Sequence, residues 1–383
     1  MSHAVSSGAW LPVYAQMPLV AVSGHGSWIV DEQGNQWLDA YGGHAVASTG
    51  HCHPHVVKAI QDQAARLIFY STAVPHRLRE ELAERMAEKC PGDLSKVFFC
   101  NSGAEANENA LGLARKVTGR QRIVSVEGGW HGRTVACLAV TDGAKYEAGA
   151  KRAGIPLSAK VPFNDSGAVE QLVDDSVAAM IVEPVQGMSG ARDCSPEFLQ
   201  AARRACDRAG AMLIFDEIQC GAGRAGAFTA AEVLGVTPDV LTLAKGLASG
   251  VPIGAMVATS SATSGVTVGD LGSTFGGGPI ACAAGLATLE VFDREHLFEN
   301  VRTVSALIRE WAHGRMPIQG LGLLLGLRCP RPAAGIQKAL FAHRVLTGTA
   351  SDPAILRLLP PLTLSRDEAA LLLARLDEVL DEA

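Results

Sequence analysis

The chain has 383 residues, a formal net charge of −6 and 48% hydrophobic residues, which is enough apolar material for a large core. It has no basic tract and no apolar run near the ~18 residues that span a bilayer, so nucleic acid and membranes are excluded as expected partners. The N-terminus has no signal-peptide pattern, and the nine cysteines are scattered and odd in number. We therefore expect a cytoplasmic protein with reduced thiols.

The first part of the chain predicts a β-hairpin over residues 19–38, where apolar segments are separated by glycine-containing turns. From about residue 50 to 290, strand-like and helix-like segments alternate. The predicted strands are residues 97–100, 123–126, 180–182, 212–215, 240–244 and 253–258. This alternation, with helices such as residues 196–208 between the strands, predicts an α/β fold with a mostly parallel sheet between helices.

The pattern changes after residue 290. A helix over residues 297–311, short strands at 321–327 and 355–359, and a final helix at 366–380 predict a smaller α+β domain. We therefore expect three parts. They are residues 1–48, an N-terminal segment that packs with the small domain, residues 49–290, the large domain, and residues 291–383, the small domain.

An acid and a lysine follow two of the predicted strands. Asp216 comes directly after residues 212–215, and Lys245 follows residues 240–244. Because parallel strands present ligands at their carboxyl ends, we expect the two side chains to meet at one edge of the sheet. A lysine flanked by small residues can form a Schiff base with a carbonyl cofactor. A buried acid can keep a pyridine nitrogen protonated, so the pair predicts pyridoxal 5′-phosphate (PLP) chemistry.

Two segments are candidates for binding the phosphate of such a cofactor. Residues 101–105 follow a predicted strand and open an alanine-rich helix, whose N-terminus offers free N–H groups and the positive end of a dipole. An ordinary capping box of Ser102 with Glu105 is the alternative, and it uses the same hydroxyl. The glycine-rich segment 272–278 can cradle phosphate through N–H and O–H groups, or it is a mobile loop.

Trp130 and Arg133 lie in a glycine-rich segment after another predicted strand. A large aromatic ring can stack on a cofactor ring. An arginine beside it can bind a substrate carboxylate in a bidentate fork. The alternative is a packed tryptophan and a solvated arginine in an ordinary loop.

Two other motifs point to different chemistry but lack the context that it requires. Residues 221–226 match the G-x-G-x-x-G pattern of dinucleotide sites, but five residues separate the first glycine from the preceding strand. The histidine-rich run at 51–55 has no partner pair at zinc spacing, and a structural zinc site takes four ligands. We therefore expect a polar loop there and no metal site.

Taken together, these segments resemble the class III aminotransferases of the ornithine and acylornithine type, which have PLP fold type I. The resemblance runs from residues 39–43 to residues 357–361. The motifs that carry it are residues 101–108, 130–134, 182–187, 215–219, 244–246 and 273–277. Within the family the chain is most similar to the acetylornithine aminotransferases. Segments 41–46 and 346–348 resemble a sub-branch that includes enzymes acting on N-succinylornithine.

The resemblance implies roles for the residues around the cofactor ring. Lys245 would form the Schiff base and carry the proton of the 1,3-shift, and Asp216 would pair with the pyridinium nitrogen. Gln219 would donate a hydrogen bond to the 3′-oxygen, and Glu183 would line the cofactor site. Trp130 would stack on the ring, at a position where the family usually has Phe or Tyr.

The same resemblance implies a phosphate site shared between two subunits. Ser102, Gly103 and Ala104 would hold the phosphate, with Ser273 nearby. Thr274 would complete the site from the neighbouring subunit, so the expected assembly is a homodimer.

For the substrates, the resemblance implies that Arg133 binds the α-carboxylate of an acylornithine and that Arg357 binds a carboxylate of glutamate or 2-oxoglutarate. Two positions depart from the family. Met188 stands where a glutamate pairs with the counterpart of Arg357, so we expect Arg357 to be permanently available to a carboxylate. Gly278 stands where the family usually has Asn, a change for which the sequence offers no functional explanation.

The implied activity is transfer of the δ-amine of N2-acetyl-L-ornithine to 2-oxoglutarate, giving N-acetylglutamate 5-semialdehyde and glutamate, as in arginine biosynthesis. Alternative substrates are N-succinylornithine and other ω-amines, such as ornithine or an acylated lysine. A PLP aminomutase or decarboxylase would share Lys245 and Asp216 but would not consume 2-oxoglutarate. A nicotinamide dehydrogenase and a non-catalytic binding protein are more distant alternatives.

Overall fold

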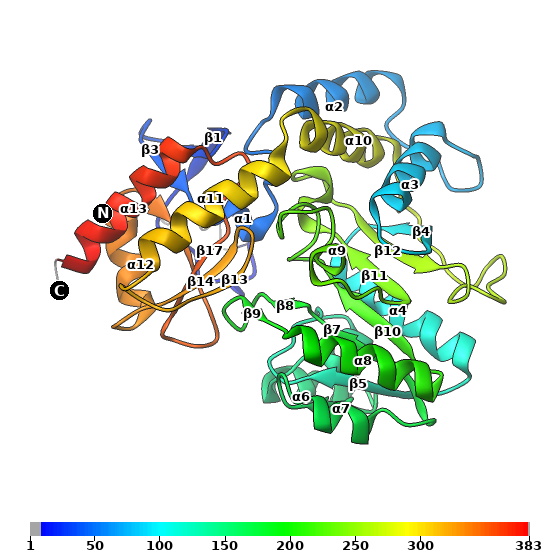
Figure 1. Ribbon diagram of the computed structural model, residues 1–383. Helices are drawn as coiled ribbons and strands as arrows, with labels where there is room; N and C mark the ends of the chain where they lie inside the picture. Colours follow the sequence, from blue (N-terminus) through cyan, green and yellow to red (C-terminus); the bar gives the residue numbers. More distant parts are fainter. Residues whose placement is uncertain (1–8, 382–383) are drawn as a thin grey trace.

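The computed structural model describes residues 9–381 and consists of two lobes (Figure 1). The larger lobe is formed by the middle of the chain. The smaller lobe combines the first and last parts, which are dark blue and yellow to red in Figure 1. Arg357 of the smaller lobe donates a hydrogen bond of 3.0 Å to the carbonyl oxygen of Gly187 in the larger lobe. The predicted site residues come from both sides of this junction.

The larger lobe is built on a central sheet that has seven strands within the described residues. Their spatial order is β4 (Leu94–Cys100), β12 (Gly254–Thr259), β11 (Val240–Leu243), β10 (Met212–Asp216), β7 (Val177–Val182), β5 (Arg122–Val126) and β6 (Ala159–Val161). From β11 to β6 all neighbours are parallel, whereas β12 is antiparallel to both β11 and β4. The prediction of an α/β fold with a mostly parallel sheet is therefore confirmed.

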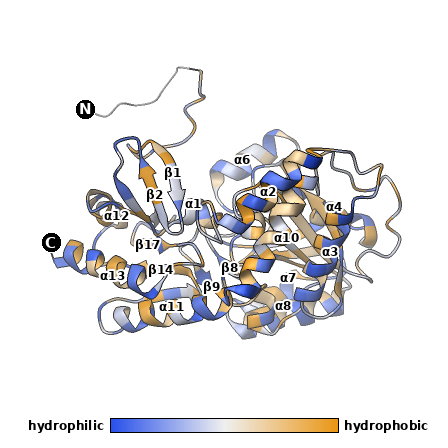
Figure 2. Ribbon diagram, turned by 90° about the horizontal axis from the view of Figure 1, so that it is seen from above, coloured by the Kyte–Doolittle hydropathy of each residue, from blue (hydrophilic) through white to orange (hydrophobic). Residues whose placement is uncertain are grey.

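Helices cover both faces of this sheet, and this explains why the sequences of its central strands are unbroken runs of mostly apolar residues. Every residue of β7, β10 and β11 is buried. Helix α10 is mostly white and orange in Figure 2, and it packs against α2 and α3. The helices of this lobe are α2 (Pro54–Arg66), α3 (Arg77–Lys89), α4 (Gly103–Thr118), α5 (Val135–Val140), α6 (Ala144–Arg152), α7 (Ser166–Leu172), α8 (Pro196–Ala209), α9 (Ala230–Leu234) and α10 (Pro279–Arg294).

The smaller lobe contains the predicted hairpin, which continues into a third strand. Its strands β1 (Ala21–His25), β2 (Trp28–Asp31) and β3 (Gln36–Asp39) form one sheet with β15 (Val345–Leu346), which pairs in parallel with β3. Trp28 Nε1 also donates to Glu368 in α13 (Arg366–Asp381), at 2.7 Å. The N-terminal segment thus shares a sheet and a partly buried hydrogen bond with the last part of the chain.

A second sheet of this lobe contains β13 (Ile318–Leu321), β14 (Leu324–Arg328), β17 (Ile355–Leu358) and β16 (Gly348–Thr349), and helices α11 (Leu297–Ala312) and α12 (Ala333–Ala342) complete the lobe. The prediction of one strand over residues 321–327 is wrong, because β13 and β14 are separate and antiparallel. Gly322 between them has φ +56°, a turn conformation that breaks the apolar run.

Two short elements remain, the ribbon of β8 (Val185–Gln186) with β9 (Arg192–Asp193) and the single turn α1 (Gly42–Ala45). Across residues 9–381, every helix is too short or too polar to cross a lipid bilayer.

Candidate active site

Asp216 and Lys245 lie at the same edge of the central sheet, as the sequence predicted. Asp216 is the last residue of β10 and pairs in register with Thr242 of β11. Lys245 opens a 3₁₀ turn (η1, Lys245–Ala248) just after β11, with φ +45°. Burial lowers the pKa of the Lys245 amine, and the charges of Asp216 and Glu183 oppose that shift. The lowered pKa favours the neutral amine, which is the nucleophilic form.

The Asp216 carboxylate is 3% exposed and is held by three hydrogen bonds. Asn107 Nδ2 and His131 Nδ1 donate to its Oδ2 at 2.7 and 2.8 Å. The N–H of Ile218 donates to Oδ1 at 3.1 Å. Asn107 is fixed in turn by Thr242, whose hydroxyl donates to Asn107 Oδ1 at 2.7 Å. A carboxylate fixed in this way is pre-oriented toward a partner that approaches from the open side.

Glu183 follows β7, next to β10 in the sheet, and ties two site loops together. Its carboxylate accepts hydrogen bonds from the N–H of Trp130 at 2.6 Å and the N–H of Gly187 at 3.1 Å. Burial raises the pKa of Glu183 to about 7, and Asp216 contributes in the same direction while His131 opposes it. This residue positions the backbone of the Trp130 loop and of the turn that precedes Met188.

At the start of α4, both predicted functions of residues 101–105 find support. Ser102 is the N-cap, and its hydroxyl accepts the Glu105 N–H at 3.2 Å, so the cap is formed. The N–H groups of Gly103 and Ala104 belong to the first turn and have no acceptor inside the helix. They remain available to an anion, because the cap uses only the N–H of Glu105.

The loop with Ser273 and Thr274 lies beside this helix start. Ser273 Oγ accepts hydrogen bonds from Asn101 Nδ2 at 3.2 Å and from the Gly276 N–H at 3.0 Å. Thr274 is exposed, and the neighbouring Phe275 ring is 62% exposed. The structure therefore places Ser273 near the helix N-terminus of its own chain and leaves Thr274 on the surface.

Trp130 and Arg133 are close to each other at the mouth of the site. The Arg133 guanidinium carbon lies 5.3 Å from the centre of the Trp130 ring. The edge of Trp130 meets the ring of Tyr146, with centroids 4.7 Å apart. Arg133 is exposed, and no residue in the described range accepts a hydrogen bond from it, so its donors are free to bind a carboxylate.

Arg357 lies on β17 opposite these residues and is 2% exposed. Its Nε donates to the carbonyl of Thr349 at 2.7 Å, Nη1 to that of Gly187 at 3.0 Å, and Nη2 to the Tyr41 hydroxyl at 3.4 Å. These acceptors are all neutral. Within residues 9–381 no carboxylate lies in salt-bridge range of Arg357, and burial lowers its pKa. The guanidinium is therefore a buried cation without a paired anion.

Sequence reasoning missed four side chains that shape this site. Asn107 and His131 lie inside recognised motifs, but nothing in their spacing reveals that both reach Asp216. Tyr41 directly precedes the turn α1 and His44 lies in it, and a hydrogen bond of 2.5 Å joins the Tyr41 hydroxyl to His44 Nδ1. Gln219, a predicted residue, touches the same turn, because its Nε2 donates to the His44 carbonyl at 3.5 Å.

The two competing motifs have structural uses. Arg224 of residues 221–226 is buried and donates to the carbonyls of Leu323 and Pro360, so this segment anchors the small lobe. In the histidine run, His51 pairs with Asp39, and the two later histidines, His53 and His55, pair with glutamates of or just after α10.

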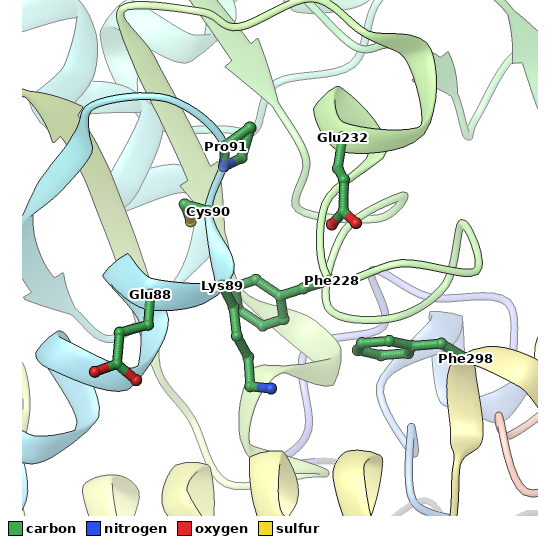
Figure 3. A pocket seen from close by; sticks show the side chains of 7 residues that line it. All are labelled: Glu88, Lys89, Cys90, Pro91, Phe228, Glu232 and Phe298. Carbon is green, nitrogen blue, oxygen red and sulfur yellow. The ribbon is translucent and has the colours of Figure 1, made fainter.

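A cavity of about 330 Å³ lies elsewhere, between the ends of α3 and α9 and the start of α11 (Figure 3). It is lined by Glu88, Lys89, Cys90, Pro91, Phe228, Glu232 and Phe298. None of the predicted site residues contributes to it. It is therefore separate from the site at the sheet edge.

Comparison with known proteins agrees with this geometry. The family described as Aminotransferase class-III matches residues 11–380. The acetylornithine aminotransferase of Methanocaldococcus jannaschii is 40% identical, with 97% of this chain and 96% of the relative covered. That of Nitrosomonas europaea is 38% identical, with 96% and 95% covered. The ornithine aminotransferase from Toxoplasma gondii ME49 has a TM-score of 0.91 at 30% identity, with 98% of this chain and 93% of that chain covered.

The chain therefore belongs to the class III aminotransferases. Enzymes of this class depend on PLP, and the residues at the sheet edge fit that cofactor. A buried lysine amine of lowered pKa faces a fixed, buried carboxylate, which suits an aldehyde and a pyridine nitrogen. The helix N-terminus at Gly103 and Ala104 suits the phosphate.

Proposed function

We propose that the enzyme transfers the δ-amino group of N2-acetyl-L-ornithine to 2-oxoglutarate, giving N-acetylglutamate 5-semialdehyde and glutamate in arginine biosynthesis. The observation that carries this proposal is the arrangement of Lys245 and Asp216 at adjacent strand ends. On the substrate side lie Arg133 and Arg357, neither of which is paired with a carboxylate of residues 9–381. The names of the relatives at about 40% identity support the choice of acyl group.

The contacts of the site residues support the following roles. Bound PLP supplies an electron sink for the negative charge that develops when the substrate loses a proton. The Lys245 amine would take the proton from Cδ of the substrate and serve as the proton carrier of the reaction. Asp216, fixed by Asn107 and His131, holds the ring nitrogen protonated.

The remaining residues bind and orient. Trp130 would pack on the ring face and Gln219 would donate to the 3′-oxygen. Glu183 keeps the loop of Trp130 in place by accepting the Trp130 N–H. Ser102 with the N–H groups of Gly103 and Ala104 holds the phosphate, beside Ser273. Arg133 binds the α-carboxylate of the acylornithine, which leaves its δ-amine at Lys245. Arg357 binds a carboxylate of 2-oxoglutarate.

The assembly that we propose is a homodimer in the cytoplasm, in which Thr274 of each subunit completes the phosphate site of the other. The exposed Thr274 and Phe275 support a partner at this loop. We further propose residues 49–290 as the large domain and 291–383 as the small domain, with residues 1–48 packing on the latter. The pairing of β3 with β15 supports that grouping.

A second candidate substrate is N-succinylornithine, whose acyl group carries its own carboxylate. The observation that favours it is the buried Arg357, whose acceptors are all neutral and include the carbonyl of Gly187, the residue before Met188. If this carboxylate uses Arg357, Met188→Glu will lower the ratio of succinyl to acetyl turnover. An unchanged ratio would rule out Arg357 as the succinyl site.

The absorption spectrum of the purified holoenzyme tests the main proposal. Addition of N2-acetylornithine without a keto acid should bleach the visible band of the bound cofactor, and later addition of 2-oxoglutarate should restore it. A band that N-succinylornithine bleaches and N-acetylornithine does not would move the assignment to the second candidate. A band that neither bleaches would exclude both acylornithines.

A further inference from the structure

The turn α1 has an unusual backbone that brings Tyr41 and His44 together. Residues 42–45 all have φ between +56° and +66°, and two of them, His44 and Ala45, are not glycine. Such conformations persist only where the surroundings hold them. Here Asp39 Oδ1 accepts the N–H groups of Tyr41 and Gly42 at 2.9 and 2.8 Å. The left-handed turn folds the His44 ring back over Tyr41, with ring centroids 4.7 Å apart.

The hydrogen bonds in this turn fix which nitrogen of His44 carries the proton. Arginine can only donate, so the Tyr41 hydroxyl oxygen accepts from Arg357 Nη2. The Tyr41 hydroxyl therefore donates its single proton in a hydrogen bond to His44 Nδ1, with an O–N distance of 2.5 Å. Because Nδ1 accepts, the ring proton of a neutral His44 is on Nε2.

Partial desolvation and two nearby cations favour the neutral form of His44, although part of its ring is exposed. Burial lowers its pKa, and the positive charges of Arg357 and Lys245 lower it further. The ionisable groups that face the ring are these two cations and Tyr41. Within residues 9–381, His44 Nε2 has no hydrogen-bond partner, although the ring lies beside the active site. An N–H donor is therefore left open beside two cations.

We propose that His44 is a substrate-binding residue whose Nε2–H donates to the carboxylate that Arg357 binds. The proposal rests on the proposed function, because the carboxylate is that of the dicarboxylic substrate, 2-oxoglutarate or glutamate. Three neutral acceptors use three of the five N–H donors of Arg357, and no carboxylate of residues 9–381 forms an ion pair with it. A bound carboxylate would supply the missing anion. One of its oxygens would pair with Arg357, and the other would accept a hydrogen bond from His44 Nε2.

A purely structural role for His44, holding Tyr41 in place, predicts a different pattern of variants. In His44→Asn the amide occupies the place of Nδ1, so it keeps an acceptor for Tyr41 but does not reach the position of Nε2. In His44→Gln the amide reaches the position of Nε2 and keeps the donor. Asparagine also tolerates a positive φ, so His44→Asn is compatible with the turn.

Calorimetric titration of the holoenzyme with glutarate, a dicarboxylate without the reacting carbonyl group, separates these roles. Loss of a donor to a carboxylate should raise the Kd of His44→Asn about tenfold, whereas that of His44→Gln should stay within about threefold. The KM for 2-oxoglutarate should rise in His44→Asn by more than kcat falls. His55→Asn, a histidine on α2 paired with Glu290, is the matched control and should bind glutarate like the parent enzyme.

The reverse order, with His44→Gln impaired and His44→Asn normal, would overturn the proposal in favour of a role confined to Tyr41. Equal Kd values in all variants would overturn it as well. Glutarate binding does not depend on which amine the enzyme accepts, so this outcome is distinct from a failure of the acetylornithine assignment.

Discussion

The cofactor side and the substrate side of the active site are built in opposite ways. On the cofactor side, Asp216 is held by Asn107, His131 and a backbone N–H, and Asn107 is itself held by Thr242. On the substrate side, the donors remain open. Arg133 has no acceptor in the described part of the chain, and Arg357 has only neutral ones.

The difference corresponds to two tasks. A closed network of buried hydrogen bonds fixes groups that must keep one geometry through the reaction. Open cationic donors suit a surface that must accept two substrates in turn and release each product. The two sides should therefore respond differently to mutation, with loss of turnover on the cofactor side and loss of affinity on the substrate side.

The largest effect should come from removal of the lysine on the cofactor side. Lys245→Ala deletes the amine that moves the substrate proton, and kcat should fall roughly 10⁴-fold or more, the upper range for general acid–base catalysis. Steady-state assays with acetylornithine and 2-oxoglutarate measure this. Lys338→Ala, at an exposed position on α12, is the control. Near-normal transamination by Lys245→Ala would contradict the assigned role.

An intermediate effect, confined to affinity, should come from the substrate side. Arg133→Ala removes an exposed guanidinium that stacks near Trp130, and the KM for acetylornithine should rise roughly 10- to 100-fold, as expected for lost bonds to a charged group. The kcat should fall much less. Arg204→Ala, at an exposed position on α8, removes a comparable surface charge and is the control. A fall in kcat with unchanged KM would mean that Arg133 contributes to turnover, like the cofactor-side residues, and not to binding of acetylornithine.

The same division separates what the sequence predicts from what it does not. Asp216 and Lys245 are predictable because each directly follows an apolar strand, and strand ends of a parallel sheet meet at one edge. The turn at Tyr41 and His44 is not, because its positive φ values depend on Asp39 and on the close approach of Gly42 to the Leu359 carbonyl. Such contacts join segments far apart in the chain and have no local pattern.

Arg357 illustrates the limit of prediction by resemblance. The resemblance to the family identifies Arg357 as a candidate, but it does not predict its three neutral acceptors, which come from segments near residues 41, 187 and 349. Asn107 and His131 are similar, since they lie within recognised motifs while their shared contact with Asp216 joins three separate elements. Fold and chemistry could be predicted, whereas the supporting contacts required the structure.

The smallest effect concerns Glu217, a second buried acid next to Asp216 that has no cationic partner among residues 9–381. Its carboxylate accepts the N–H groups of Ala230 and Ala231 at the start of α9, at 2.5 and 2.7 Å. Burial raises its pKa from the ordinary 4.5 to about 8. The folded state therefore binds this proton more tightly than the unfolded chain, and the stabilisation is lost as the pH rises from about 4.5 to 8.

Glu217→Gln removes this titration, so wild type should lose stability relative to the variant between pH 6 and 8, by up to roughly 1.4 kcal/mol per pH unit. Denaturant unfolding of both holoenzymes at several pH values measures the difference. Glu197→Gln, an exposed acid in the first turn of α8, should show no such trend. A difference that does not change with pH would mean that Glu217 stays ionised in the fold. In that case the two N–H groups of α9 would be enough to hold an unpaired charge beside Asp216.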